Sequence, residues 1–528
     1  MNTGSVDIAV IGGGISGLYT AWRLSSGPDP PRVAVFESSP RLGGRIDTVP
    51  LPVPSPGASA ELGAMRFFPF MAMVKNLLEY LGIQTEVFPG NTPRQMFLRN
   101  VQLNPDGSGT NLPYQLATGE PTSPFGLIER ILDGSVPNAV GLSARQWRDV
   151  TRNGRFKGHE LWRWGVRNIA EELISNEAYE FVYDGAGLDS MFLKTNAAIG
   201  MRCIATPLPD YIAGRVYRPV RGFGSLVAEL ENRLEAYPSC HIFRQHRLMS
   251  VGRAADGIEL NFAPGAHAEI ACEQTIASKV VLALPRRAVE LIDFDEFFPA
   301  KQRDAQRRQF QGKLADVEGI PAFKLCVVYE KAWWQGFTDN AGVARGWKDG
   351  YSVTDLPIRQ VFFGMGQGPD PAANERVLLA SYTDTEAARY WEGLVNVSPS
   401  KLRLGSTFQF HEVGAGSFLL DAIERQLRAL LQTRDPLPKA LGVAFMNWDV
   451  DPYGGGWHEW NPGVDVTEAI PDMRRPVPGA PIYLCGEAYS WFQAWIEGAL
   501  MSAERMLQDH FQLSWPTEWL PGDYDLGP

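Results

Sequence analysis

Three glycines and one acid near the start of the chain have a spacing that suits nucleotide chemistry. Gly12, Gly14 and Gly17 form a GxGxxG pattern, and Glu37 follows about 20 residues beyond it, as expected for an acid that bonds a ribose. Such glycines permit a tight turn, a close approach of the backbone to a pyrophosphate, and close packing of a helix. The unpaired N–H groups at that helix N-terminus attract phosphate. The spacing therefore predicts a dinucleotide site.

The flanking elements determine whether this pattern has meaning, because the chain has 53 glycines and GxGxxG also arises by chance. Residues 6–11 are a continuous apolar run, typical of a strand buried on both faces. A helical apolar pattern covers residues 18–24, and a second strand is expected over residues 32–36, ending at Glu37. This strand, helix and strand order strongly favours dinucleotide binding, but it does not separate FAD from NAD.

Size and charge narrow the class of protein. The chain has 528 residues, 45% hydrophobic and 21% charged, which is enough for more than one core. The net charge of -11 argues against nucleic acid, whose phosphates require clustered Lys and Arg. The basic run at residues 301–313 is interpreted as the solvated face of a helix. We expect a soluble globular protein that does not bind nucleic acid.

Membrane spans and metal sites are not expected. No stretch approaches the roughly 20 apolar residues of a transmembrane helix. The first element is expected at Val6, which leaves no space for a leader, so we expect a cytoplasmic protein. The five cysteines contain no CxxC pair, which favours reduced, buried thiols over zinc or disulfides.

Further motifs carry a family resemblance. They are RLGGR at 41–45, ELGAMRF at 61–67, RPVRGFGS at 218–225, the lysine-bearing apolar run AFKLCVVY at 322–329, TDLP at 354–357, WDVDPYGGG at 448–456, GE at 486–487 and WIEGA at 495–499. Residues 51–56 form a proline-rich loop before the second motif. In this order the motifs resemble flavin-dependent amine oxidases, in the branch of L-amino-acid oxidases and amino-acid 2-monooxygenases. The resemblance covers nearly the whole chain.

The resemblance implies FAD as the cofactor and assigns its contacts. Arg45 would reach the phosphates, the backbone near Leu248 would contact the adenine end, and Glu487 would meet the ribityl and phosphate region. The N-terminus of the helix after Trp495 would face the pyrimidine end of the flavin. The full predicted set is Gly12, Gly14, Ile15, Ser16, Gly17, Glu37, Ser38, Gly44, Arg45, Gly63, Ala64, Met65, Arg66, Leu248, Gly486, Glu487, Trp495, Ile496 and Ala499.

The resemblance also assigns the catalytic groups. Arg66 would grip the substrate carboxylate, because a guanidinium offers a planar fork that matches two carboxylate oxygens. Lys324, an ammonium in an apolar strand, needs a partner or a function, and in the family the matching lysine holds a water against flavin N5. Alternatively, Lys324 and Arg66 are a snorkelling strand lysine and an ordinary loop arginine.

The walls of the substrate site are predicted from aromatic residues. Trp495, with Trp491 or Tyr489, would border the substrate amine, and Phe362 and Phe363 would form another wall. Several relatives place a Tyr at one of these two phenylalanines, where its hydroxyl helps the arginine, so the second carboxylate contact is unassigned here. The glycines at 454–456 and the aromatic residues after them suggest a mobile pocket edge, in which His458 is weak evidence for catalysis.

We therefore predict an α/β (mixed α+β) fold with three parts. A Rossmann-like FAD-binding domain would be assembled from residues 1–72, 212–292 and 472–512, and a mixed-sheet substrate-binding domain from 73–110 and 293–471. A helical subdomain would cover 111–211 and a tail 513–528. Substrate should bind where the parts meet.

The expected reaction is oxidative deamination of an L-amino acid by hydride transfer from Cα to flavin, with dioxygen as the acceptor. Alternatives are an L-amino-acid 2-monooxygenase, an amine or polyamine oxidase, which Arg66 argues against, and a flavin-bearing desaturase or a non-catalytic flavoprotein. Asp184 and Asp189 could select a basic side chain, but we interpret them as surface acids. A homodimer is the default expectation for the assembly.

Overall fold

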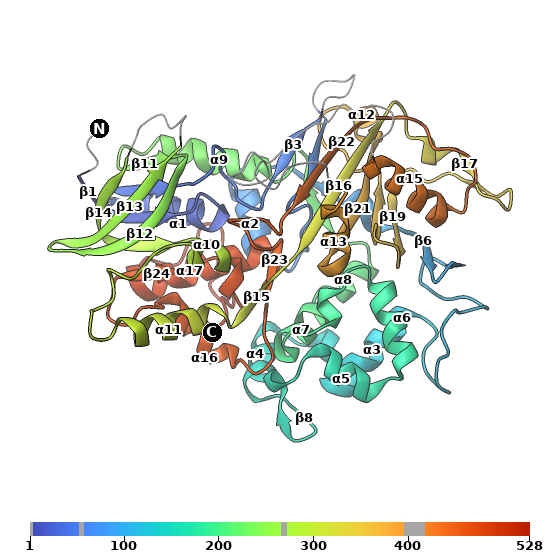
Figure 1. The fold of residues 1–528 in the computed structure, drawn as a ribbon, viewed down its shortest axis with the longest axis horizontal. Helices are drawn as coiled ribbons and strands as arrows, with labels where there is room; N and C mark the ends of the chain where they lie inside the picture. The colour runs from blue at the N-terminus through green and yellow to red at the C-terminus, as the bar shows by residue number, and fades with distance from the viewer. Residues whose placement is uncertain (1–3, 52–57, 266–271, 395–417) are drawn as a thin grey trace.

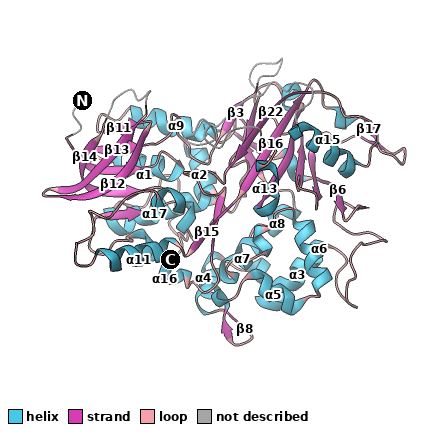
Figure 2. Ribbon diagram, viewed as in Figure 1, coloured by secondary structure: helices cyan, strands magenta, loops and turns pink. Residues whose placement is uncertain are grey.

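The computed structural model describes residues 4–51, 58–265, 272–394 and 418–528. Most of the proline-rich loop at 51–56 lies outside the described residues. Figure 1 shows one sheet with its helices on the left, a second sheet on the upper right, and a group of helices below. Figure 2 shows that the strands concentrate in the two upper regions, where helices accompany them, while the lower region is nearly all helix. The predicted mixed α/β fold is confirmed, while the predicted domain boundaries stay predictions.

The first sheet is built around β1 (Ser5–Ile11), which pairs in parallel with β2 (Val33–Phe36) and β14 (Gln274–Leu282). The last four residues of β1 and all of β2 are buried, as the apolar runs predict. The sheet continues to β11 (Cys240–Phe243) beside β2, and to β13 (Gly257–Pro264) and β12 (His246–Ala254) beyond β14. The last part of β14 pairs in parallel with β24 (Ile482–Leu484), from the far end of the chain.

Helices α1 (Ile15–Ser25), α9 (Gly224–Glu235) and α17 (Ile496–Phe511) pack together against this sheet. Close approach of α1 requires Gly17, because a Cβ there would lie 1.9 Å from the carbonyl oxygen of Gly12. Gly12 has a φ of 105°, a conformation that favours glycine. Helices α10 (Arg286–Glu290), α11 (Arg303–Leu314) and α16 (Val466–Arg474) lie on the same side of the molecule (Figure 1).

The second sheet follows the order β22-β16-β21-β20-β19-β6-β7. Its strands are β22 (Ala440–Asn447), β16 (Ala322–Tyr329), β21 (Val377–Asp384), β20 (Gln360–Phe363), β19 (Gly350–Thr354), β6 (Pro93–Leu98) and β7 (Val101–Leu103). Successive residues of a strand point to opposite faces. One face, which includes Phe362, joins the main core; the other, which includes Phe363, forms a second core. That second core is completed by α13 (Thr385–Glu392) and α15 (Phe418–Leu431).

The third region consists mainly of helices that lie, along the chain, between β7 of the second sheet and β11 of the first sheet. They are α3 (Pro124–Ser135), α4 (Ala144–Asn153), α5 (Val166–Leu173), α6 (Asn176–Ala186), α7 (Ala197–Ala205) and α8 (Leu208–Ile212). After α8 the chain forms β10 (Tyr217–Pro219), which pairs with β5 (Thr85–Val87). The stretch before this region contains β5, β6 and β7, and the last two belong to the second sheet.

Two local expectations need comment. The residues after the glycine run at 454–456 form β23 (Trp457–Trp460), which pairs with β15 (Val317–Ile320); Trp457 lines the cavity described below, and the mobility of this edge stays a prediction. Asp189 is buried and forms an ion pair of 2.6 Å with Arg359, while Asp184 is half-buried and accepts a hydrogen bond of 2.7 Å from Tyr114. The interpretation of both acids as ordinary surface residues is therefore wrong.

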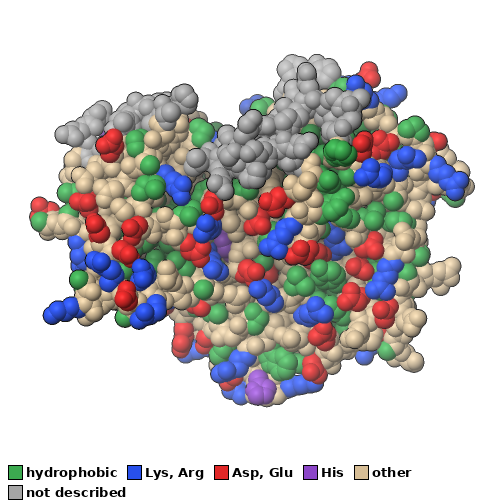
Figure 3. All heavy atoms as spheres, in the orientation of Figure 1, with side chains coloured by type: hydrophobic (Ala, Val, Ile, Leu, Met, Phe, Trp, Pro, Cys, Tyr) green, Lys and Arg blue, Asp and Glu red, His purple; other side chains and the backbone are tan. Residues whose placement is uncertain are grey.

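Other expectations concern the surface and the cysteines. In the described part of the chain, no helix is long and apolar enough to cross a membrane. The face drawn in Figure 3 has basic and acidic side chains intermixed. The five cysteines are free thiols, and four of them are buried.

Candidate active site

A cavity lies where four parallel strands of the first sheet end. Gly12 follows β1, Glu37 follows β2, Leu284 lies just past β14, and Gly486 lies just past β24; all four residues line the cavity. Ligands of doubly wound sheets bind outside the carboxyl ends of the strands. The cavity therefore occupies the position that this architecture reserves for a dinucleotide.

Two helices begin at this cavity without a side-chain cap. Gly14 precedes α1 and Trp495 precedes α17, and neither helix has a side-chain hydrogen bond at its N-cap. The only acid in the first turn of α17, Glu497, points away and accepts hydrogen bonds from the N–H groups of Met73 and Val74 in α2 (Ala72–Tyr80). Uncapped N–H groups and the helix dipole both attract anions.

The glycines beside these helix ends leave room for a ligand. A Cβ added to Gly14 would meet no protein atom within 4 Å, and at Gly44 it would meet only the Cα of Gly14, at 3.3 Å. At Gly63 a Cβ would instead lie 1.9 Å from the carbonyl oxygen of Arg45. Gly14 and Gly44 thus border open space that a side chain would fill, whereas Gly63 is required by packing. This cradle and the uncapped helix ends fit the pyrophosphate of FAD.

Most of the predicted cofactor residues line this one cavity. They are Gly12, Gly14, Ile15, Ser16, Glu37, Ser38, Gly44, Arg45, Gly63, Ala64, Leu248, Gly486, Glu487, Trp495, Ile496 and Ala499. Gly17, Met65 and Arg66 do not line it. Gly17 is covered by its packing on Gly12, and Met65 is buried in the core.

Glu37 is held in place by the backbone around it. Its carboxylate accepts hydrogen bonds from the N–H groups of Gly13 at 2.7 Å and Ser39 at 2.8 Å. These bonds fix the orientation of the acid at the end of β2 and leave further acceptor capacity on both oxygens. The geometry suits an acceptor for ribose hydroxyls.

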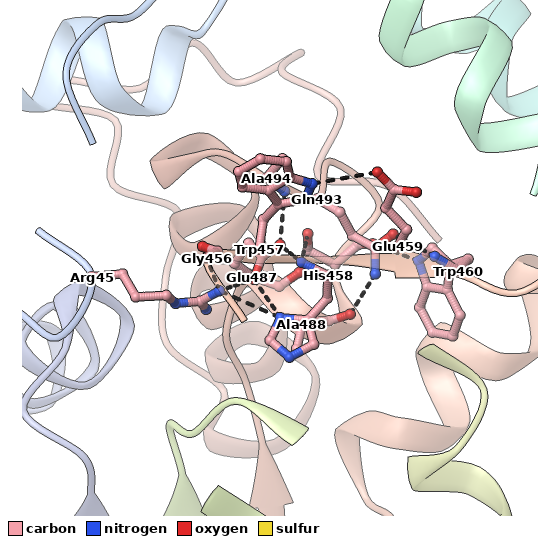
Figure 4. A network of polar contacts seen from close by, with 11 residues as sticks. Arg45, Gly456, Trp457, His458, Glu459, Trp460, Glu487, Ala488, Gln493 and Ala494 are labelled. Carbon is pink, nitrogen blue, oxygen red and sulfur yellow. Dashed lines mark hydrogen bonds and ion pairs between the residues drawn. The ribbon is translucent and has the colours of Figure 1, made fainter. Parts of the chain in front are cut away.

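Glu487 is the centre of a buried polar network (Figure 4). Its carboxylate forms an ion pair of 2.7 Å with Arg45 and a contact of 3.0 Å with Nδ1 of His458. It also accepts hydrogen bonds from the backbone N–H groups of His458 at 2.9 Å and Ala494 at 2.7 Å. One carboxylate therefore ties together the motif after β2, strand β23 and the loop before α17.

The charges of this network follow from these contacts. Burial raises the pKa of Glu487, but Arg45, His458 and the Ala494 N–H outweigh it and bring the pKa to about 2. Burial lowers the pKa of His458 despite the neighbouring carboxylate. Glu487 is therefore ionised and His458 neutral at pH 7, so the network contains one compensated ion pair.

Lys324 lies at the end of the cavity nearest the second sheet. Its ammonium donates to the carbonyl oxygen of Gly63 at 2.5 Å and lies 4.6 Å from the ring centre of Tyr382, its direct partner across β16 and β21. Burial lowers the pKa of Lys324 to about 7, with a smaller opposing effect from Glu61. Lys324 and Tyr382 both line the cavity. The structure thus places a titratable amine, rather than a snorkelling lysine, next to the motif at 61–67.

Arg66 lies among aromatic rings next to this end of the cavity. Its Cζ is 5.6 Å from the ring centre of Phe88, 5.9 Å from Tyr211 and 5.8 Å from Phe362. Its charge also acts on Lys324 and Tyr382. Within the described ranges, Arg66 forms no ion pair with an acid, and its Nη1 is buried without a hydrogen-bond partner. Arg66 as a whole is half-buried, so its guanidinium is a partly buried cation to which the described residues supply no counter-ion.

Two predicted wall residues face elsewhere. Phe363 points to the opposite face of the sheet from Phe362 and packs against Trp334 and Trp347. Trp491 does not line the cavity; its ring lies under the guanidinium of Arg202, 3.7 Å from Cζ, and it is 2% exposed. Of the predicted walls, Trp495 lines the cavity and Phe362 contacts Arg66.

Three tyrosines near Arg66 escape prediction from sequence. Tyr382 faces Lys324, Tyr211 ends the helical region, and Tyr351 lies opposite Phe362 across β19 and β20. Only the alternation of side chains along a strand could have indicated Tyr351, because Tyr351 lies on the same face of the sheet as Phe362 once β19 and β20 are paired. The pairing itself is not visible in the sequence.

The fold and the site place this protein in the class of flavin-binding oxidoreductases. Comparison of its sequence with known families then identifies the family. The profile of the flavin containing amine oxidoreductases matches residues 15–407 and 417–506. The chain belongs to this family, and its cofactor is FAD.

Individual relatives are more distant. The chain is 24% identical to Aplysianin-A from Aplysia kurodai, over 96% of this chain and 90% of that protein. It is 24% identical to Achacin from Lissachatina fulica, over 96% and 93%, and 23% identical to L-amino-acid oxidase 4 from Hebeloma cylindrosporum, over 99% and 84%. A solved structure of putrescine oxidase bound to putrescine aligns over 96% of this chain and 99% of that one, with a TM-score of 0.65 and 16% identity. At that identity the structural likeness supports the fold alone.

Proposed function

We propose that this protein is an FAD-dependent oxidase of L-amino acids, which converts an L-amino acid, water and dioxygen to a 2-oxo acid, ammonia and hydrogen peroxide. The observation that carries the proposal is Arg66, a half-buried guanidinium whose buried Nη1 has no hydrogen-bond partner and which has no acid partner in the described part of the chain. Leaving a buried donor of a charged group unpaired is costly. A substrate carboxylate would supply the missing charge and match the planar fork with two hydrogen bonds.

The surroundings of Arg66 support an amino acid over a simple amine. Phe88 and Phe362 hold the guanidinium by cation–π contact but accept no in-plane hydrogen bond from it. An amine substrate has no group for this fork. The name of the relative from Hebeloma cylindrosporum, L-amino-acid oxidase 4, agrees with the proposal.

The residues of the chain divide the work of the reaction. Arg66 orients the substrate through its carboxylate, which turns a random encounter into a positioned one. Lys324, with a pKa of about 7, is partly neutral at neutral pH and is available to accept a proton from the substrate ammonium or from a water. FAD, held in the cavity lined by Gly14, Glu37 and Glu487, would supply the two-electron oxidation of Cα and the delivery of those electrons to dioxygen. Water then hydrolyses the imino acid, releasing ammonia.

An anaerobic screen tests the proposal. The purified holoenzyme is mixed with individual L-amino acids and with the amines that lack their carboxylates, and bleaching of the flavin absorbance is followed. We expect bleaching by amino acids and little by the amines. Arg66→Ala should weaken amino-acid turnover by about 2–5 kcal/mol, the usual effect of removing one partner of a buried charged contact. Faster bleaching by the amines would refute the proposal.

Product analysis separates the remaining reaction type. A 2-oxo acid with ammonia identifies the oxidase, whereas an amide that has lost the carboxyl carbon identifies a 2-monooxygenase.

The cytoplasmic location and the homodimer stay predictions, which fractionation of the source cells and sizing of the purified protein would test.

A further inference from the structure

Two phenols beside Arg66 have no part in the proposed reaction so far. Tyr351 on β19 lies directly opposite Phe362 on β20, and the two rings stack with centroids 5.7 Å apart. Tyr211 on α8 contacts both Arg66 and Tyr351, with its ring centre 6.1 Å from that of Tyr351. The two phenols therefore approach the guanidinium from the second sheet and from the helical region.

The hydroxyl groups of this pair interact. Burial raises the pKa of Tyr351 well above its ordinary value, the Tyr211 hydroxyl raises it further, and Arg66 opposes both effects. At neutral pH Tyr351 is therefore protonated, and because the two hydroxyls share one hydrogen bond, the pair has one further O–H that it can donate outward. Tyr351 is 6% exposed, whereas Tyr211 is half-buried. A donor at this place matches the second carboxylate contact that the sequence leaves unassigned.

An acid held by Arg66 alone would satisfy only part of its hydrogen-bonding capacity. A carboxylate accepts about four hydrogen bonds, and a guanidinium fork supplies two of them. Phe88 and Phe362 supply none, because phenyl rings carry no donor. Of the three tyrosines near the guanidinium, Tyr382 faces Lys324, which leaves the pair of Tyr211 and Tyr351 as the donors considered for the carboxylate.

We propose that the hydrogen-bonded pair of Tyr211 and Tyr351 donates its outward O–H to the substrate carboxylate that Arg66 holds. The inference rests on the proposed function. Its consequence is that recognition of the acid is shared by three parts of the chain: the loop after β4 (Ser59–Glu61), strand β19, and helix α8. Both tyrosines are positioning residues for binding, since neither has to exchange a proton.

Calorimetric titration of the holoenzyme with benzoate, and with its uncharged analogue benzamide, tests this inference. The variants are Tyr211→Phe, Tyr351→Phe and the double variant, each of which keeps the ring and removes only the hydroxyl. Tyr80→Phe is the matched control, because Tyr80 is 43% exposed and its ring contacts involve Trp22 and Arg233, away from the pocket. Flavin absorbance shows that each variant retains the cofactor.

The double variant, and the single variant that removes the outward donor, should weaken benzoate binding roughly tenfold or more, because a hydrogen bond to a charged group contributes that much. Benzamide binding should change little, and the ratio of kcat/KM for an amino acid to that for its amine should fall in parallel. A purely structural role would affect both ligands equally. Unchanged benzoate affinity in the double variant would overturn the inference.

Arg66→Met separates this inference from the proposed function. If benzoate binding is lost in Arg66→Met but retained in the double tyrosine variant, only the tyrosine assignment fails. If Arg66→Met binds benzoate like the wild type, or if the wild type does not bind benzoate, the carboxylate site itself is refuted and both proposals fail.

Discussion

Substitution of Gly14 by alanine would separate cofactor binding from folding. Gly14 has φ −71° and ψ 175°, angles that alanine adopts, and a Cβ there would contact no protein atom within 4 Å. The cost to the helix N-cap is about 1 kcal/mol, and reduced freedom of the unfolded chain offsets about 0.4–1 kcal/mol of it. The unfolding free energy should therefore change by less than about 1 kcal/mol.

The effect on FAD should be much larger, because the new methyl group enters the space between α1 and the phosphates. Loss of one hydrogen bond to a charged group costs about 1.5–3 kcal/mol, which corresponds to a Kd roughly 10- to 150-fold weaker. The assay is fluorescence titration of the apoprotein with FAD, together with thermal unfolding of the apoprotein.

Two other glycines provide matched controls. Gly27→Ala also adds a Cβ in open space, away from the cavity, and should leave both FAD affinity and stability unchanged. In Gly17→Ala the new Cβ would lie 1.9 Å from a backbone oxygen, so the fold itself should be destabilised. A Gly14→Ala protein that folds and binds FAD with wild-type affinity would refute the placement of the phosphates beside Gly14.

Three further predictions follow from groups outside the phosphate cradle. The rate of flavin reduction should rise with pH through about 7, because burial lowers the pKa of Lys324 to about 7 and its neutral form accumulates above that value. Stopped-flow measurements with Lys324→Met should show no such rise. A pH profile of Lys324→Met identical to that of the wild type would exclude this role for Lys324. Arg359→Met should destabilise the protein by about 3–5 kcal/mol in denaturant unfolding, because Asp189 loses its buried partner. The control Arg389→Met, at an exposed ion pair with Glu386, should cost about 0–1 kcal/mol. Equal losses of stability in the two variants would contradict the role given to the buried ion pair. Gly90→Ala should raise KM for the amino acid at normal FAD content, because its Cβ would come within 2.5 Å of Phe88 and 2.6 Å of Phe362 beside Arg66; an unchanged KM would show that these rings do not shape the site.

The cofactor cavity could be predicted from sequence because its residues are fixed by local geometry. Gly12, Gly14 and Glu37 occupy a single strand, turn and helix unit, so their spacing along the chain determines their spacing in space. Glu487 and Trp495 could likewise be placed by the strand before them and the helix after them. The cavity gathers these segments at the carboxyl ends of neighbouring parallel strands.

What could not be predicted depends on partners that are distant in sequence. Asp189 resembles a surface acid until Arg359, on the second sheet, is placed beside it. The sequence does not distinguish Phe362 from Phe363, and only the pairing of β19 with β20 shows which of the two faces Arg66. The glycine run at 454–456 suggests a loop, but strand β15 supplies a partner for the residues that follow.

The pairing of β24 with β14 has a consequence for the order in which the protein is made. β14 ends at Leu282 and β24 begins at Ile482, so at roughly 5–20 residues per second a ribosome needs about 10–40 s to supply the missing strand. During that interval the edge of β14 next to Val280 is unpaired and the nascent chain lacks Glu487 and helix α17. Loading of the cofactor is therefore a late event, which follows translation of nearly the entire message.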